Sequence, residues 1–241
     1  MSKTLLEVTW LHISYDKWQS YILRDISFDL CEWEILSIIG KNGTGKSSLL
    51  KAIAWVQKYH SGNIHKKTSH ISYIPQKIHL EESFPLTVKE FFSIFNEKIS
   101  QRKLLDTLKL FWTQEFLNKN IHDLSGWEFQ KVLITNALLS DPDIMLLDEP
   151  TSWIDIIWEE QFYANIMQIQ KTYPKMSIIL VSHNLNLVYK NSTRVICLHE
   201  NNLCCHGSPA HVMNNKDIQD IFGSYLRPYE HAPHAAHHHT H

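Results

Sequence analysis

One eight-residue stretch constrains the fold of this chain more than any other feature. The stretch GKNGTGKS (40–47) matches the pattern G-x-x-x-x-G-K-[ST], and it directly follows the apolar run ILSII (35–39). From Lys46 onward, apolar residues recur at the spacing of an amphipathic helix. A strand, a glycine-containing loop and a helix in this order are the context that the pattern requires for a phosphate-binding loop. The sequence therefore predicts an α/β fold built to hold a phosphate group.

Each part of the stretch has a chemical reason to bind phosphate. Gly43 and Gly45 permit the positive φ angles that let successive backbone amides converge on phosphate oxygens. Lys46 is expected to reach the terminal phosphates, and Ser47 to ligate Mg²⁺. The alternative is a glycine-rich turn that matches by chance. The predicted nucleotide-binding residues of this stretch are Gly40, Lys41, Asn42, Gly43, Thr44, Gly45, Lys46, Ser47 and Ser48.

Two acidic residues follow another apolar run. The segment IMLLDEP (144–150) predicts a buried strand, and Asp148 and Glu149 stand at its C-terminal end, the edge at which α/β sheets bind ligands. Asp148 is predicted to hold Mg²⁺ through water, and Glu149 to be the catalytic base that accepts a proton from the attacking water. Alone, such a pair is more often a solvated strand end. The phosphate-binding stretch upstream favours the catalytic interpretation.

The remaining periodicity places these motifs in a larger frame. Residues 4–39 alternate in short apolar and polar runs, which is typical of a small antiparallel sheet leading into a buried strand. A helical pattern at about 155–172 separates the apolar runs 144–150 and 177–184, which is the βαβ rhythm of a parallel sheet. The predicted fold class is α/β, a phosphate-loop NTPase with an N-terminal antiparallel β subdomain.

A helical subdomain is predicted at about 83–140, because the periodicity of this region is mostly helical. Its apolar positions are Val88, Phe91, Phe92 and Phe95 in the first helix and Phe129, Val132, Leu133 and Ala137 in the last. The predicted division of the chain is one nucleotide-binding domain over 1–228 and a histidine-rich tail over 229–241.

Composition excludes several classes of protein. The 23 Lys and Arg balance 25 Asp and Glu, so the chain lacks the basic footprint that nucleic-acid binding requires. No apolar stretch approaches the roughly 20 residues of a membrane span, and the N-terminus lacks a signal-peptide core. The four cysteines have neither zinc-site nor disulfide-framework spacing and are expected to be reduced. A cytosolic protein that can sit against a membrane protein is expected.

Further motifs make the chain resemble the nucleotide-binding subunit of an ABC transporter. Tyr15 matches the aromatic residue that stacks on adenine, although a strand-edge tyrosine is the alternative, and Gln76 matches the glutamine that reaches Mg²⁺ and the attacking water. Asp155 matches the loop that crosses to a second subunit. His183 matches the histidine that contacts the γ-phosphate. The family's signature matches Leu124, Ser125, Gly126, Trp127 and Glu128.

The resemblance implies a RecA-like core for the α/β domain, and it also implies how such a chain works. It implies ATP and Mg²⁺ as ligands, and two subunits arranged head to tail so that Ser125 and the amides after it bind the ATP of the opposite subunit. It also implies a homodimer or a pair of such subunits at the cytoplasmic face of the membrane, bound to a transmembrane permease and served by an extracytoplasmic metal-binding protein. The amino-acid sequence of the signature region most resembles that of the ATPase subunits of zinc, manganese and iron importers. The alternatives are a soluble ATPase of a non-transport machine, such as iron–sulfur assembly, and a degenerate subunit that does not hydrolyse ATP.

Several tryptophans of the chain stand at positions where the family has glycine. There are 8 tryptophans and only 7 glycines, whereas average usage predicts roughly 17 glycines. Trp127 occupies the second signature glycine, where an indole is expected to fill the gap between phosphate and helix terminus. The others stand at turns or loops that suit glycine, namely Trp10, Trp18, Trp33, Trp55, Trp112, Trp153 and Trp158. One hypothesis is that these are UGA codons that the source organism reads as glycine. A genuinely degenerate ATPase is the alternative.

The tail HAPHAAHHHTH is rich in a metal-binding side chain. Imidazole suits zinc and copper, so a zinc-binding tail is predicted. The alternatives are a purification-tag remnant and a solvated tail, and the interruptions by Ala, Pro and Thr disfavour the tag. The predicted ligands are His231, His234, His237, His238, His239 and His241.

Overall fold

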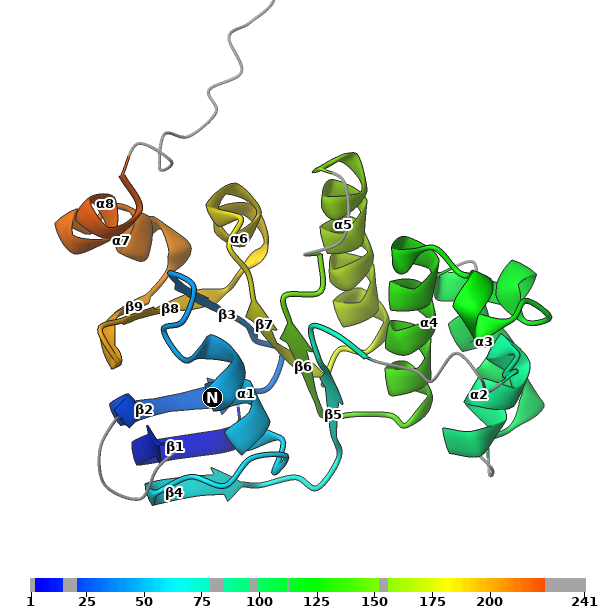
Figure 1. Cartoon of the computed structure of the whole chain (residues 1–241), viewed down its shortest axis with the longest axis horizontal. Helices are drawn as coiled ribbons and strands as arrows, with labels where there is room; N and C mark the ends of the chain where they lie inside the picture. The colour runs from blue at the N-terminus through cyan, green and yellow to red at the C-terminus, as the bar shows by residue number, and fades with distance from the viewer. Residues whose placement is uncertain are drawn as a thin grey trace, which may run out of the picture.

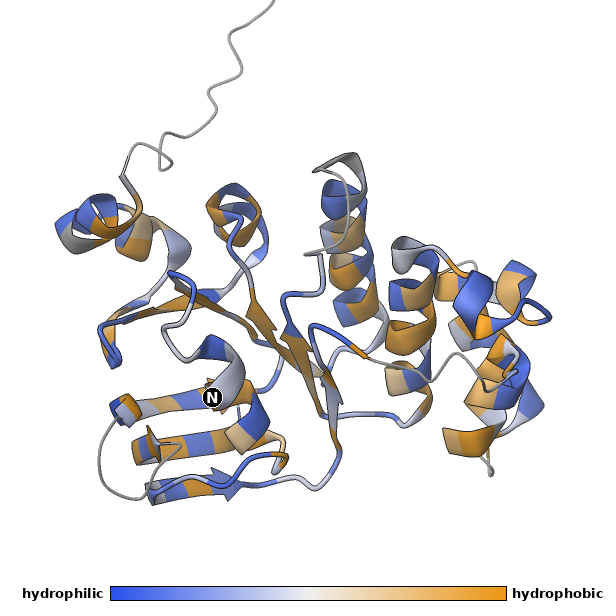
Figure 2. Cartoon of the chain, viewed as in Figure 1, coloured by the Kyte–Doolittle hydropathy of each residue, from blue (hydrophilic) through white to orange (hydrophobic). Residues whose placement is uncertain are grey.

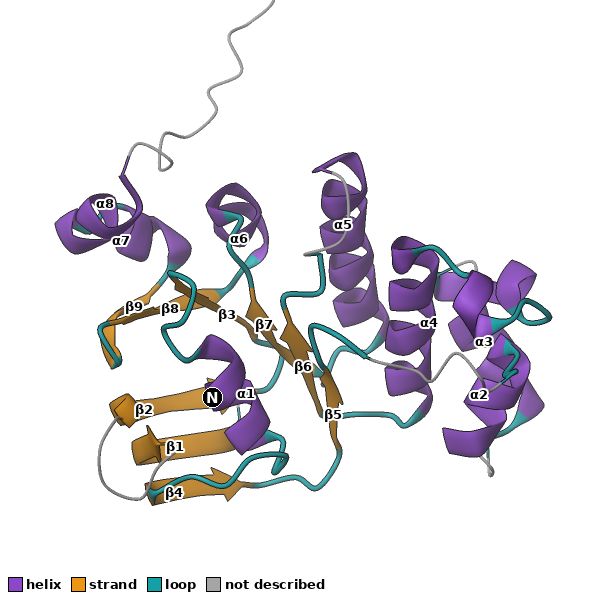
Figure 3. Ribbon diagram, viewed as in Figure 1, coloured by secondary structure: helices purple, strands orange, loops and turns teal. Residues whose placement is uncertain are grey.

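The structure is a computed structural model that describes residues 3–14, 21–78, 85–95, 99–111, 113–151 and 156–223. Two β-sheets form its centre, and helices lie between the sheets and beyond the larger one (Figures 1 and 3). The α/β fold predicted from the sequence is confirmed. None of the described helices is long and apolar enough to cross a lipid bilayer.

The smaller sheet is antiparallel and has the strand order β2-β1-β4. Its strands are β1 (Thr4–Ser14), β2 (Tyr21–Cys31) and β4 (Ser61–Lys66). Alternation of burial along β1 turns Leu6, Val8, Leu11 and Ile13 inward, as expected for a sheet with one face on the core. The sequence predicted β1 and β2 but not β4.

The larger sheet has the strand order β5-β6-β7-β3-β8-β9, and all neighbouring pairs except β8–β9 are parallel. Its strands are β3 (Ile35–Gly40), β5 (Ile71–Ile74), β6 (Ile144–Asp148), β7 (Ser177–Val181), β8 (Arg194–His199) and β9 (Asn202–Gly207). Every residue of β3, β6 and β7 is buried, because helices or the second sheet cover both faces. Figure 2 shows the corresponding band of hydrophobic residues along these strands.

Helix α1 (Lys46–Ile53) lies between the two sheets (Figure 1). Its residues Leu49, Leu50 and Ile53 are fully buried in a core cluster that also contains residues of both sheets. On the other side of the larger sheet, α4 (Gly126–Leu139) and α5 (Ile156–Thr172) pack in a second cluster, and the C-terminal helices cover a third. The C-terminal helices are α6 (Leu185–Asn191), α7 (Pro209–Met213) and α8 (Lys216–Phe222).

The region 83–140 is helical, as predicted, within its described residues. Its elements are α2 (Val88–Phe95), α3 (Gln101–Leu110), the 3₁₀ turns η1 (Thr113–Phe116) and η2 (Ile121–Asp123), and α4 (Gly126–Leu139). Val88, Phe91 and Phe92 are buried against α4 and its neighbours. The helical spacing predicts that Phe95 is also an inward-facing apolar residue, but Phe95 is 62% exposed. It is the last residue of α2, and its ring lies against the ring of Phe91.

Candidate functional site

The phosphate-binding stretch forms the connection from β3 to α1, as predicted. Gly43 and Gly45 have φ angles of 82° and 91°, in the region that glycine tolerates and other residues rarely adopt. A Cβ atom on Gly45 would also lie 2.8 Å from the Leu23 side chain. The close approach of β2 to the loop therefore requires glycine at position 45.

Lys46 is buried at the first turn of α1. Its Nζ donates hydrogen bonds to the carbonyl oxygens of Gly40 and Lys41, each at 3.0 Å, and lies 3.8 Å from a carboxylate oxygen of Glu149. Burial lowers the pKa of Lys46, and the charges of Glu149 and Asp148 oppose this shift. The ammonium group thus curls back over the loop, where a phosphate could replace its carbonyl partners.

Asp148 accepts two hydrogen bonds at the end of β6. The Ser47 hydroxyl donates to one carboxylate oxygen at 2.9 Å, and the Tyr73 hydroxyl of β5 donates to the other at 3.2 Å. Burial raises the pKa of Asp148, against these hydrogen bonds, which lower it. A carboxylate and a serine hydroxyl are hard oxygen ligands of the kind that Mg²⁺ prefers, so this pair fits the ion. Tyr73 was not predicted from the sequence.

Glu149 has a strained backbone beside the same site. Its φ is 45°, which is uncommon for a residue other than glycine, and such strain concentrates at functional positions. The Gln76 side-chain amide donates to a Glu149 carboxylate oxygen at 2.8 Å. The structure therefore brings together four residues that the sequence singled out separately, Lys46, Asp148, Glu149 and Gln76.

A cavity of about 640 Å³ opens over these residues, which is a volume typical of ligand sites. It is lined by Tyr21, Ile22, Asn42, Gly43, Gly45, Lys46, Ser47, Ser48, Gln76, Glu149 and Asn201. Tyr21, Ile22 and Asn201 were missed from the sequence. Tyr21 follows Tyr15 by six residues in the sequence, so a second tyrosine close to the predicted one is a signal that could have been used. Asn201 comes from the β8–β9 turn, where no motif marks it.

Of three other predicted site residues, the structure describes only His183. Tyr15 and Asp155 lie outside the described residues. His183 is exposed in the turn after β7 and is not among the residues that line the cavity. Because Asp148 pairs with Val181 in parallel register, Glu149 and His183 leave the sheet at the same edge.

The signature residues lie apart from this cavity. Ser125 caps the N-terminus of α4, and a capping box links it to Glu128 in both directions, at 3.3 and 2.8 Å. The Lys119 ammonium donates a hydrogen bond of 2.9 Å to the Glu128 carboxylate, and this contact lowers the pKa of Glu128. None of the residues that line the cavity belongs to 124–128, and α4 begins beyond β5 and β6, away from α1 (Figure 1). One chain therefore does not bring its signature to its own phosphate loop.

The indole of Trp127 does not behave as expected. It is half-buried against α5, where its ring centre lies 6.1 Å from that of Trp158 and 6.2 Å from that of Phe162. The expectation that the indole fills the space beyond the helix terminus is therefore wrong, since the side chain packs along the helix flank. Its buried Nε1 has no hydrogen-bond partner among the described residues, so the packing leaves a polar atom unsatisfied.

One polar cluster near the site was not predicted. Glu159 of α5 is buried and accepts hydrogen bonds from the Thr151 hydroxyl at 2.9 Å and from the Asn184 side-chain amide at 2.8 Å. Thr151 follows Glu149 by two residues, and Asn184 follows His183 directly. Glu159 thus ties together the two segments that carry the predicted catalytic residues.

Known proteins match this architecture over most of the chain. A family model described as ABC transporter matches residues 23–152. A zinc import ATP-binding protein of Aliivibrio fischeri is 38% identical over 221 residues, which cover 91% of this chain and 84% of the relative. One from Buchnera aphidicola subsp. Baizongia pistaciae is 40% identical over 225 residues, which cover 90% of this chain and 92% of the relative.

Solved structures show the same fold. An ATP-binding cassette of an ABC transporter in its ADP conformation matches with a TM-score of 0.78 at 15% identity, covering 92% of this chain and 99% of the other. A metal-chelate type ABC transporter in an inward-facing conformation matches with a TM-score of 0.79 at 22% identity, covering 91% and 89%. With a phosphate loop, an acidic strand end and these relatives, the chain belongs to the ABC transporter family, as an ATP-binding and ATP-hydrolysing subunit.

Proposed function

We propose that this chain hydrolyses ATP to drive the import of zinc through a membrane permease. The observation that carries the proposal is the relationship to zinc import ATP-binding proteins, which are 38% and 40% identical to the chain over at least 90% of its length. The intact phosphate loop and the acidic end of β6 supply the chemistry that such a subunit needs. In this proposal, the subunit lies peripherally at the cytoplasmic face of the membrane, and an extracytoplasmic protein delivers the metal.

The cavity residues have distinct roles in this proposal. The amides of 42–47 and the Lys46 ammonium bind phosphate oxygens, with Tyr15 or Tyr21 beside the adenine. Ser47, Asp148 and Gln76 hold Mg²⁺, which would neutralise phosphate charge when bound. These assignments are supported by the contacts of Ser47 with Asp148 and of Gln76 with Glu149.

Glu149 is the base in this proposal. It accepts a proton from the attacking water, while His183, at the same sheet edge, contacts the γ-phosphate. The base needs its carboxylate free, so the Lys46 ammonium at 3.8 Å and the Gln76 amide at 2.8 Å must turn from Glu149 to the ligand.

The signature completes the site of a second copy of the chain. Because residues 124–128 stand apart from the cavity of their own chain, the Ser125 hydroxyl and the amides at the start of α4 are available to the ATP of a partner. The same helix terminus makes the capping box, so closing the dimer exchanges the cap of α4 for phosphate contacts. Asp155, which directly precedes α5 in the sequence, crosses to the partner in this proposal.

Zinc uptake by a reconstituted transporter tests the proposal. The chain is combined in liposomes with a candidate permease and a candidate metal-binding protein from its source organism, and uptake of zinc, manganese and iron is followed with ATP on the cytoplasmic side. Zinc uptake that requires ATP is expected. The matched controls are Lys46→Ala, which should abolish uptake, and Lys58→Ala, an exposed lysine that should leave uptake unchanged. Manganese or iron uptake without zinc uptake would contradict the choice of ion, and ATP hydrolysis without any uptake would contradict the transport function.

A further inference from the structure

Three tryptophans of this chain have backbone conformations that suit glycine. The φ angles of Trp10, Trp33 and Trp55 are 50°, 70° and 60°. Positive φ occurs in a few per cent of non-glycine residues, so three of the five described tryptophans would adopt it by chance on the order of once in a thousand chains. None of the described phenylalanines or tyrosines has a positive φ, whereas six of the seven glycines do. Within the described residues, the tryptophans therefore follow the backbone statistics of glycine and not those of aromatic residues.

Trp55 occupies the position that ends a helix with glycine. The amide of Val56 donates to the Lys51 carbonyl oxygen at 2.9 Å, and the amide of Trp55 donates to the Ala52 carbonyl oxygen at 3.1 Å. These two bonds form a Schellman motif after α1, and the residue that is left-handed in this motif is usually glycine because it lacks a Cβ atom. The fold itself sets this conformation, since the motif satisfies the last carbonyl groups of α1.

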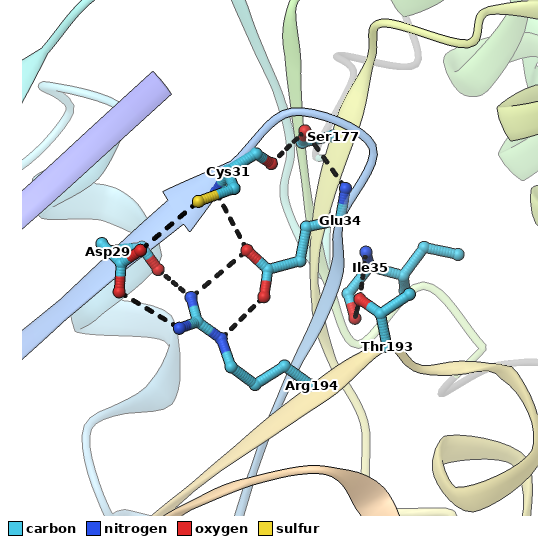
Figure 4. A network of polar contacts seen from close by, with 7 residues as sticks. All are labelled: Asp29, Cys31, Glu34, Ile35, Ser177, Thr193 and Arg194. Carbon is cyan, nitrogen blue, oxygen red and sulfur yellow. Dashed lines mark hydrogen bonds and ion pairs between the residues drawn. The ribbon is translucent and has the colours of Figure 1, made fainter. Parts of the chain in front are cut away.

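Trp33 lies in a tight turn between β2 and β3 that is fixed on both sides. Figure 4 shows the polar network that holds the residues on either side of it in the sequence: the Cys31 amide donates to a Glu34 carboxylate oxygen at 2.9 Å, and the Ser177 hydroxyl donates to the Cys31 carbonyl oxygen at 2.7 Å. Arg194 pairs with the other Glu34 carboxylate oxygen at 2.6 Å. The residue between these anchors must turn the chain with a positive φ, which is the reason that turns select glycine.

Trp10 is the extra residue of a β-bulge. From Val8 to Leu11, β1 advances by three residues while β2 advances by two, and the pairing with β4 skips in the same place. A bulge whose first residue is left-handed has glycine there. The opposing strand gives no room to relax, because a Cβ atom on Gly62 would lie only 2.3 Å from the Trp10 carbonyl oxygen.

The three indoles make few contacts that could offset this backbone strain. The residues are 68%, 61% and 65% exposed, so most of each ring faces solvent. Trp55 lies 6.3 Å from the Tyr59 ring and beneath the Lys66 ammonium, which are contacts of the surface. The three lie on a strand bulge, a strand-to-strand turn and a helix end, so one binding surface does not explain them.

We propose that the protein, as its source organism makes it, has glycine at positions 10, 33 and 55, and at the other five tryptophan positions by the same rule. The rule is the reading of one codon: UGA encodes tryptophan in one variant genetic code and glycine in another. The proposal does not rest on the proposed function, since backbone angles carry it. At position 127, glycine removes the indole with its unsatisfied Nε1, and at 158 it removes the ring that packs on this indole.

The nucleotide sequence of the gene gives the first test. UGA is expected at all eight tryptophan positions, and peptide mass spectrometry of the protein isolated from its source is expected to find glycine there. UGG codons at 10, 33 and 55 would overturn the proposal, and so would tryptophan in the native peptides. Neither result bears on ATP hydrolysis, so the proposal and the proposed function can fail separately.

Thermal unfolding of recombinant variants gives the physical test. Relieving a left-handed conformation in a residue with a Cβ should shift the folding equilibrium by about five- to thirtyfold per position, so Trp10→Gly, Trp33→Gly and Trp55→Gly are each expected to raise Tm. The matched control is Phe95→Gly, because Phe95 is 62% exposed but lies in a helix, and it is expected to lower Tm. A lower Tm in all three tryptophan variants would overturn the structural argument.

Discussion

The Ser47 hydroxyl donates a hydrogen bond of 2.9 Å to the Asp148 carboxylate, across 101 residues of sequence. This bond joins the start of α1 to the end of β6, and the Tyr73 hydroxyl holds the second carboxylate oxygen from the neighbouring strand. The two motifs that the sequence offered separately thus meet as one oxygen-rich site. Their contact places the two predicted ligands of a divalent cation side by side.

Asp148→Asn should stabilise the free protein while abolishing Mg²⁺-dependent hydrolysis. Burial raises the pKa of Asp148, so between its ordinary value and the raised one the native state binds more protons than the unfolded state. The contribution of Asp148 to the free energy of unfolding therefore falls as pH rises through this window, and its cost is complete at neutral pH. Asparagine should therefore raise the free energy of unfolding at pH 7.

Urea unfolding of both proteins at several pH values measures this effect. The difference between Asp148→Asn and the parent should shrink as pH falls toward the ordinary pKa of an aspartate. Asp220→Asn serves as the control, since Asp220 is exposed on α8. A difference that does not depend on pH would show that the charge of Asp148 is not its cause.

Lys46→Ala should lose ATP binding. The Lys46 ammonium is the buried cation of the cavity, and a charge-assisted bond to phosphate contributes about 1.5–3 kcal/mol, so the Kd should rise at least tenfold. Titration calorimetry with ATP measures it, with Lys58→Ala as the exposed control. An unchanged Kd would contradict the assignment of the phosphate loop.

The parts of the fold that carry local signals were predicted from the sequence. Apolar runs of strand length gave β3, β6 and β7, because strands covered on both faces are hydrophobic throughout. The β8–β9 hairpin and β4 were missed, because their residues alternate weakly and their places depend on pairing with distant strands. Proximity through pairing also brings the sulfur atoms of Cys197, Cys204 and Cys205 within 4.8 Å of one another, although their spacing predicted no site.

The candidate site was predictable where a motif names a residue and its place in an element. Lys46, Ser47, Asp148 and Glu149 are of this kind. Tyr73 and Asn201 were not, since Tyr73 reaches Asp148 only because β5 pairs with β6, and Asn201 reaches the cavity through a hairpin turn. The direction of the Trp127 side chain was also not predictable, because the sequence does not show that α5 lies beside α4.

Ser125→Ala should separate the two uses of the signature. The Ser125 hydroxyl caps α4, and the loss of an N-cap costs about 1 kcal/mol of the free energy of unfolding. ATP binding to the isolated chain should stay unchanged, because Ser125 does not line the cavity, whereas ATP hydrolysis should fall. Ser100→Ala is the control, since Ser100 caps α3 and should affect stability alone. Equal hydrolysis in both variants would contradict the role of the signature in a partner's site.

Deletion of residues 231–241 should lower zinc binding while leaving basal ATP hydrolysis nearly unchanged. The tail lies outside the described residues, and its six imidazoles are the predicted zinc ligands. Calorimetry with zinc on the full and shortened chains measures the binding, and a phosphate-release assay measures hydrolysis. Equal zinc binding in both chains would show that the tail is not a metal site.

The most direct test of the account is whether Glu149→Gln traps a dimer with ATP. Glutamine keeps the shape of the side chain but cannot accept the proton, so two chains should remain joined by two unhydrolysed ATP molecules. Size-exclusion chromatography with ATP and Mg²⁺ should show a dimer for Glu149→Gln, and the same variant should be a monomer without nucleotide. The control variant is Glu160→Gln, because Glu160 is exposed on α5, and it should stay a monomer. The measurement is made on the chain with tryptophan and on the chain with glycine at the eight positions, and the dimer is predicted for both forms, because the Trp127 indole packs against α5. A monomer in both forms under every nucleotide condition would contradict the shared site between two copies.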